Sequence, residues 1–281
     1  MSTEYQQEKK QGVWGPGTLL ADRYEIEDVV KASGTCCLYR ARDVFRGTNH
    51  LIVGPGHRAC EQEGGLIWFE EYCQKAVIIP AHPNVLTPKR VDHHRKIAFL
   101  LMPDFEGEFW DSAIKEGHLR ELPAMLSVAT QTARGLAWLH RQSCIHYNVK
   151  PANVVICDSG FSKVWKYGET GASTRAYASP EQISGEPLTP ATDTWSWGVS
   201  VLHMFVGKVT WPAGHLAAAV LERYVRNGPA VPGLPPMPPP LVDVLAKCFH
   251  GDPAQRPADM KEVVTALEGM SGVPPQPQEA Q

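Results

Sequence analysis

The chain has 281 residues, 43% of them hydrophobic, and a net charge of −3. This length suits one large domain or two smaller lobes that enclose a sizeable core. A slightly acidic balance provides no general positive field, so we expect no nucleic-acid partner. No window approaches the ~18 consecutive apolar residues of a membrane span, so we expect no membrane partner either.

The seven cysteines are scattered along the chain without a C-x-x-C pair. This spacing gives no zinc site, and the odd number beside mostly apolar neighbours favours reduced thiols. Residues 1–11 are too polar for a signal peptide. We therefore expect a cytoplasmic protein without a metal site.

The first third of the chain predicts a small β-rich lobe. Residues 1–17 are polar and interrupted by Gly and Pro, so we expect them to be disordered. Alternating apolar and polar residues predict strands, and Ser-Gly-Thr at 33–35 predicts the turn of a hairpin. The expected strands lie at residues 24–30, 38–42, 49–53 and 97–102. A helix is expected over 67–78 and a turn over 93–96.

The rest of the chain is mainly helical in pattern. Residues 121–142 form the clearest amphipathic helix, with Leu, Met and Ala repeating on one face. Further helices are expected at residues 213–225, 241–249 and 258–267. The proline-rich tract 228–240 leaves two interpretations open, a polyproline ligand or an irregular connection between two helices.

The stretch 144–156 carries the clearest functional signal. It has an apolar entry, a polar loop held by a proline, and a Val-Val-Ile run that predicts a buried strand. It resembles the catalytic loop His-Arg-Asp-Leu-Lys-Pro-x-x-Asn of the eukaryotic-type Ser/Thr protein kinases. The residues of that loop kept here are His146, Lys150, Pro151 and Asn153.

Three later motifs extend the resemblance. Residues 179–181 resemble the family's Ala-Pro-Glu, 193–199 its Asp-x-Trp-Ser-x-Gly, and 252–257 its Asp-Pro-x-x-Arg-Pro. The resemblance implies an α+β, bilobal fold with a small β-rich N-lobe and a larger, mainly helical C-lobe. The expected segments are a disordered segment 1–17, an N-lobe 18–102, a hinge 103–107, a C-lobe 108–268, and a disordered tail or linker 269–281.

The residues that hold the family's scaffold are present. In the family, Arg256 would pair with Glu181, and Asp193 would hold the backbone of the catalytic loop. The glycines that let the family's backbone close over phosphates are replaced by other residues. Lys31, Ser33 and Cys36 stand at those three positions, which favours a plain β-hairpin.

The residues that carry the family's chemistry are replaced as well. Val53 or Gly54 stands where the family has its strand lysine, which leaves Glu70 or Glu71 in the following helix without that partner. Asn148 stands where an aspartate accepts the proton of the substrate hydroxyl, and Tyr147 replaces the arginine before it.

The metal position is changed too. Lys166-Tyr167-Gly168 lies where the family has Asp-Phe-Gly, so a cation replaces the magnesium ligand. The pattern predicts a pseudokinase, a kinase-like regulatory or protein-interaction module that binds another protein. The alternative is a divergent active Ser/Thr protein kinase that binds ATP and phosphorylates protein hydroxyls. A third possibility is a sensor of a small molecule.

We expect no required cofactor and no intact catalytic group, although Lys150 is retained. Two states of the nucleotide site stay open. In one, Lys150 and Lys166 bind the phosphates of ATP without magnesium; in the other, Trp165, Lys166 and Tyr167 fill an empty cleft. The candidate nucleotide-binding residues are Met102, Pro103, Phe105, Lys150, Asn153 and Lys166.

Overall fold

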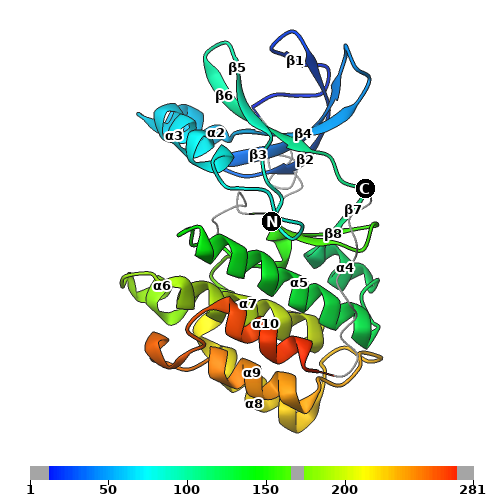
Figure 1. Ribbon diagram of the computed structural model, residues 1–281, viewed down its shortest axis with the longest axis vertical. Coiled ribbons are helices and arrows are strands. Elements are labelled where there is room, and N and C mark those ends of the chain that lie inside the picture. Colours follow the sequence, from blue (N-terminus) through cyan, green and yellow to red (C-terminus); the bar gives the residue numbers. More distant parts are fainter. Residues whose placement is uncertain (1–12, 166–173, 271–281) are drawn as a thin grey trace, which may run out of the picture. The chain divides into compact units, whose positions relative to one another are not determined.

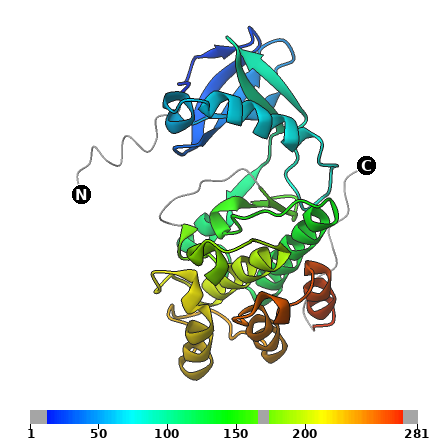
Figure 2. The ribbon, with the colours of Figure 1, turned by 90° about the vertical axis from the view of Figure 1, so that its left-hand side faces the viewer.

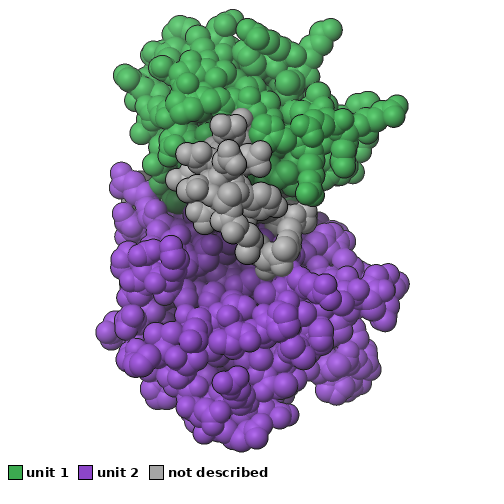
Figure 3. Space-filling model, turned by 180° about the vertical axis from the view of Figure 1, so that it is seen from behind, with its two compact units in different colours: residues 1–81, 86–105 green, residues 82–85, 106–281 purple. Residues whose placement is uncertain are grey.

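The structure, a computed structural model, describes residues 13–165 and 174–270 (Figure 1). The chain divides into two compact units, residues 1–81 with 86–105, and residues 82–85 with 106–281 (Figure 3). The short segment 82–85 belongs to the second unit, although the sequence placed it in the N-lobe. The Asn84 side chain donates to Oε1 of Gln131 at 2.9 Å, and Val85 forms a bridge with Val164.

The first unit is built on one antiparallel sheet with the strand order β1-β2-β3-β4-β6-β5. Its strands are β1 (Leu19–Leu20), β2 (Tyr24–Ala32), β3 (Cys36–Asp43), β4 (Asn49–Pro55), β5 (Arg90–His94) and β6 (Ile97–Pro103). Its helices within the described residues are α2 (His57–Glu61) and α3 (Gly65–Val77), of which α3 packs along the sheet (Figure 2). The four expected strands and the expected helix are present. The turn expected over 93–96 is shorter, because both histidines belong to β5.

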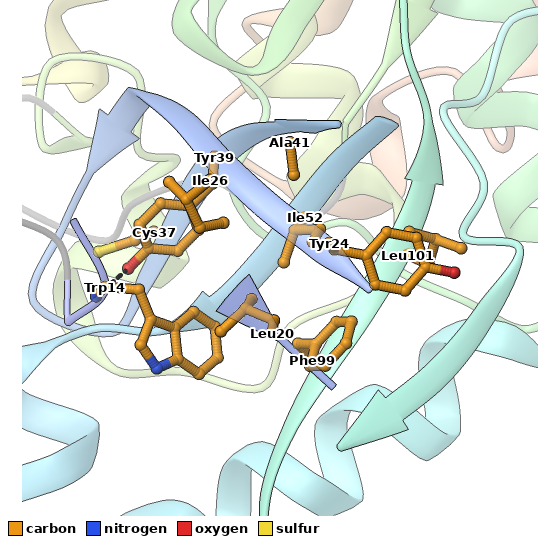
Figure 4. Packing of buried hydrophobic residues seen from close by; sticks show 10 residues of the cluster. All are labelled: Trp14, Leu20, Tyr24, Ile26, Cys37, Tyr39, Ala41, Ile52, Phe99 and Leu101. Carbon is orange, nitrogen blue, oxygen red and sulfur yellow. Dashed lines mark hydrogen bonds between the residues drawn. The ribbon is translucent and has the colours of Figure 1, made fainter. Parts of the chain in front are cut away.

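One face of the sheet carries a buried aromatic and aliphatic cluster (Figure 4). Trp14 lies in it, only 6% exposed, and its backbone N–H donates to the Tyr39 hydroxyl. The ring also meets Phe99 edge to face. The disorder expected for residues 1–17 therefore does not extend to Trp14, because a large apolar ring gains more by burial than the short segment loses in entropy.

The second unit is mainly helical. Its small sheet contains β7 (Gly107–Phe109), β8 (Val154–Cys157) and β9 (Ser162–Val164). Its helices are α4 (Trp110–Glu116), α5 (Leu122–Arg141), α6 (Pro180–Ser184), α7 (Pro190–Val206), α8 (Ala217–Asn227), α9 (Pro239–Cys248) and α10 (Met260–Glu268). Short 3₁₀ turns lie at Pro151–Asn153, Gly214–Leu216 and Pro253–Gln255. The proline-rich tract connects α8 to α9, which confirms the connection that the sequence left open.

Helix α7 is the buried centre of the second unit. Asp193 and nearly every residue after it in the helix are buried. Gly198 allows α9 to approach closely, because an added Cβ would lie 2.8 Å from the Phe249 ring. The Trp197 ring nitrogen donates to the backbone oxygen of Ala129 in α5 at 3.1 Å. This rigid helix supports the loop that the sequence singled out.

Candidate functional site

The polar side chains of the 144–156 stretch meet in one buried cluster. Lys150 Nζ lies 3.1 Å from Thr174 Oγ1, and that hydroxyl lies 3.4 Å from Asn148 Oδ1. The side chain of Asn153 donates to the backbone oxygen of Asn148 at 2.8 Å. All three loop side chains are buried. The structure therefore brings together three of the polar residues that the sequence selected.

Another oxygen in this cluster belongs to the side-chain carbonyl of Asn153. Within the described part of the chain, this buried oxygen has no hydrogen-bond partner. A neutral amide oxygen is a weak ligand for a divalent cation unless carboxylates accompany it. Asn148, its neighbour in the loop, offers another neutral amide rather than a carboxylate.

The backbone of the loop is held from α7, as the resemblance implied. Asp193 accepts the backbone N–H groups of His146 at 2.7 Å and Tyr147 at 2.8 Å. The ring of His140 lies 2.8 Å from the same carboxylate. Tyr147 has φ of +65°, a strained conformation that these charge-assisted hydrogen bonds hold in place.

A buried ion pair fixes the end of the 174–181 segment. The Arg256 guanidinium contacts both carboxylate oxygens of Glu181, at 2.7 and 3.0 Å. Burial opposes ionisation of Glu181, but the hydrogen bonds and charge of Arg256 outweigh it and lower the pKa of the carboxyl. The pairing that the family motif implied is confirmed.

Tyr177 in the same segment is not an accessible hydroxyl. Its ring is buried, and its Oη lies 3.0 Å from Nδ1 of His203 in α7. Burial raises the pKa of Tyr177 and lowers the pKa of His203 to about 4. Both groups are therefore neutral near pH 7, and their contact acts as packing inside the helical unit.

In the first unit, β4 presents Val53 at the position of the family's lysine. Side chains alternate between the faces of a strand, and Ile52 lies in the Trp14 cluster. Gly54 lies under the same cluster, because an added Cβ would come 2.3 Å from the Trp14 ring. Val53 therefore points to the opposite face, opposite Leu38 of β3, and is fully buried. The sequence left Val53 and Gly54 as equal candidates.

Backbone hydrogen bonds hold the tip of the β2–β3 hairpin against residues 56 and 58. The backbone oxygen of Thr35 accepts from the N–H of Gly56 at 2.9 Å, and that of Gly34 accepts from Arg58 at 2.8 Å. Gly56 has no room for a side chain, because an added Cβ would lie 2.2 Å from the backbone oxygen of Ser33. The plain hairpin that the sequence favoured is thus anchored at the start of α2.

The hinge residues carry an internal contact that the sequence did not indicate. The backbone N–H of Phe105, a candidate nucleotide-binding residue, donates to Asp104 Oδ1 at 2.9 Å. Pro103 and Met102 are the other two candidate nucleotide-binding residues of this segment. Pro103 ends β6. Met102 is fully buried and pairs with Leu51 of β4.

The α3 glutamates have other partners. Glu70 lies 2.8 Å from Nε2 of His93 and 2.9 Å from the Gln74 amide. Glu71 lies 3.9 Å from Lys75 one turn along the helix. Both pairs are on the surface. The side-chain amide of Gln74 and then the His93 ring lower the pKa of Glu70, although burial opposes this.

Lys166 and Tyr167 lie outside the described residues. Trp165 lies just before this gap and is buried. Its backbone N–H donates to the oxygen of Asn153 at 2.8 Å. Trp165 is therefore hydrogen bonded to the end of the catalytic loop.

Comparison with known proteins identifies the family. The family model for the protein kinase domain matches residues 63–266, more than half of the chain. The chain therefore belongs to the protein kinase family. The match begins after β4, so it leaves out the hairpin tip and Val53.

Two curated relatives are bacterial. A probable serine/threonine-protein kinase of Clostridium acetobutylicum is 25% identical over 269 residues, which cover 90% of this chain and 41% of the relative. The serine/threonine-protein kinase PknA of Mycobacterium tuberculosis is 30% identical over 259 residues, which cover 85% of this chain and 59% of that relative. The chain spans about two fifths of the length of the first of these relatives.

Solved structures show the same fold. The crystal structure of the PknI kinase domain of Mycobacterium tuberculosis is similar with a TM-score of 0.67 at 17% identity. The match covers 91% of this chain and 99% of that one. The α+β, two-lobed kinase fold that the motifs implied is thereby confirmed.

Proposed function

We propose that this chain is a pseudokinase, a kinase-like domain that regulates or binds another protein without transferring phosphate itself. The observation that carries the proposal is the catalytic loop. Its scaffold contacts are complete, yet the group at the proton-accepting position is the amide of Asn148. An amide cannot accept a proton at pH 7, so the loop lacks its general base.

The nucleotide-handling residues support the same proposal. Val53 has no charge to offer a phosphate, and the hairpin tip is hydrogen bonded to Gly56 and Arg58. The loss of each such group lowers the rate of phosphate transfer about 10²–10³-fold, and the separate losses need not be additive. Together they leave too little stabilisation of a transferring phosphoryl group for useful catalysis.

The donor set does not suit magnesium. The described loop offers the neutral oxygens of Asn148 and Asn153, and the residue aligned with the metal-binding aspartate is Lys166. Magnesium sites in this fold combine carboxylates with phosphate oxygens. We therefore propose no step through the metal, and we propose that any ATP is bound without it.

The partner of the domain in this proposal is a protein, and the location is the cytoplasm. None of the seven cysteines, all of which lie in described segments, forms a disulfide, which fits a reducing compartment. Over residues 13–165 and 174–270, no helix is long and apolar enough to cross a membrane.

A divergent active kinase is the second candidate. The relatives are named as serine/threonine-protein kinases, and Lys150 of the catalytic loop is retained. In this reading Lys150 and Lys166 would neutralise the phosphates of ATP in place of a metal.

Transfer of labelled phosphate from ATP distinguishes the two candidates. The purified chain is incubated with magnesium, with manganese or with neither, beside a Lys150→Ala variant prepared in parallel. We expect incorporation no greater than that of the variant under every condition. Incorporation by the parent chain that the substitution abolishes would overturn the pseudokinase proposal. Thermal shift with ATP, with and without magnesium, reports nucleotide binding separately.

A further inference from the structure

A small cavity lies in the second unit between α5 and α10, the two helices that pack side by side in Figure 1. Its volume is about 190 Å³. The loop cluster around Asn148 contributes no residue to its lining. The cavity is therefore separate from the candidate site described above.

The shape of the cavity follows from helical spacing. Arg134, Ala137 and Arg141 are three and four residues apart, so they share one face of α5. The two arginines are about 10 Å apart along the helix axis, with the short alanine side chain between them. Val264 of α10 provides the facing apolar wall. The result is a hollow with an apolar floor between two cationic ends.

The end at Arg141 is the more positive. The guanidinium of Arg141 lies over the Trp138 ring at 5.0 Å, and the His82 ring stacks on the same indole at 5.1 Å. Lys261, in the first turn of α10, also lines the cavity. Among the described residues, neither Arg141 nor Lys261 forms an ion pair.

One carboxylate, Asp259, lines the cavity, and another, Glu268, pairs with the lining residue Arg134. Asp259 accepts the backbone N–H of Lys261 and so caps α10. At the other end, Glu268 accepts two hydrogen bonds from Arg134, at 3.0 and 2.7 Å. Three cations, Arg134, Arg141 and Lys261, face the two carboxylates of Asp259 and Glu268. The surplus of one positive charge lies at the end of the cavity that contains Arg141 and Lys261.

We propose that this cavity binds a phosphate monoester, carried by a phosphorylated peptide or by a small organic phosphate. A planar guanidinium fits phosphate oxygens, and an ammonium group adds a second charge. The volume is below the ~300 Å³ of typical ligand pockets but is adequate for one phosphorylated side chain. The floor at Ala137 and Val264 contacts the apolar body of the ester.

The test is calorimetric titration of the whole chain at neutral pH. The probes are inorganic phosphate, phenyl phosphate and a short phosphothreonine peptide, with the unphosphorylated peptide as the negative control. We expect a dissociation constant on the order of 0.1 mM for the best phosphate ester. Preference for the peptide identifies a phosphoprotein partner, and equal binding of phenyl phosphate identifies a small-molecule source.

Matched substitutions locate the site. Arg141→Gln and Lys261→Gln should each weaken binding about five- to tenfold, because each removes one charged contact. Lys115→Gln removes the same charge from an 82% exposed lysine of α4 and should change affinity less than about twofold. Glu268→Gln frees Arg134 and should tighten binding about two- to threefold.

The proposal fails if no probe binds below about 10 mM, or if Lys115→Gln weakens binding as much as Lys261→Gln. Unfolding curves of each variant separate a lost site from a lost fold. The tightening expected for Glu268→Gln cannot arise from misfolding. None of these results depends on phosphate transfer, so they stand apart from the pseudokinase test.

Discussion

Removing the guanidinium of Arg256 should strongly destabilise the helical unit. Arg256→Met leaves Glu181, whose side chain is 4% exposed, as a buried carboxylate with neutral donors such as the Thr192 hydroxyl but no cation beside it. It also removes hydrogen bonds from the guanidinium to the backbone oxygens of His250 and Ala191. Breaking a buried pair by removing one partner costs about 3–5 kcal/mol. At roughly 2–4 °C per kcal/mol, the melting temperature should fall by about 6–20 °C.

Thermal and urea unfolding measure this cost, and two controls test its cause. Glu181→Gln combined with Arg256→Met should destabilise by at least about 1 kcal/mol less than the sum of the single changes, because the stranded charge is gone. The cost of Arg256→Met should also shrink as the pH falls, because burial without the guanidinium raises the pKa of Glu181 and favours its protonated form. Additive changes, or a melting temperature within about 2 °C of the parent, would show that the loss of Arg256 leaves no costly buried charge.

Two further predictions concern the sheet. Gly54→Ala should lower the free energy of unfolding by up to about 3–5 kcal/mol, because the new Cβ displaces the Trp14 ring. In a Trp14→Ala background the same substitution should lower it by almost nothing more, as measured by urea unfolding. An equal loss of stability in the parent chain and in Trp14→Ala would show that Trp14 does not occupy the space beside residue 54. The hydrogen bond from Arg23 lowers the pKa of Asp43 to about 2, so its stabilising contribution is complete above about pH 4 and is lost as the pH falls toward 2. Asp43→Asn should abolish the loss of stability that protonation of Asp43 causes between about pH 4 and pH 2. The same pH dependence of unfolding in the parent and the variant would contradict this prediction.

The sequence predicted the elements that have strong local patterns. Helix α5 extends over Leu122–Arg141 against an expected 121–142, because its apolar face repeats at helical spacing over five turns. The contacts of Asp193 and Arg256 were also predicted, since both residues lie in motifs with specific spacing. Short elements were missed. Helix α4 (Trp110–Glu116) has seven residues, too few to establish a period.

Other features have no signal in the sequence. Trp14 is a single aromatic residue among polar ones, and its burial depends on a gap opposite Gly54, forty residues later. Asp104 contacts the backbone of Phe105, but in the sequence nothing distinguishes it from any other polar residue of a hinge. The cavity beside Arg141 combines residues more than one hundred positions apart. Such arrangements depend on tertiary packing, which residue patterns do not encode.

The bonds at the hairpin tip join main-chain atoms, oxygens of residues 34 and 35 with amides of 58 and 56. These links involve no side chain of residues 31, 33 or 36, so putting glycines back at those three positions would leave the links in place. Converting this domain into an efficient phosphotransferase would therefore require rebuilding the chain after β4, beyond replacing the lost chemical groups.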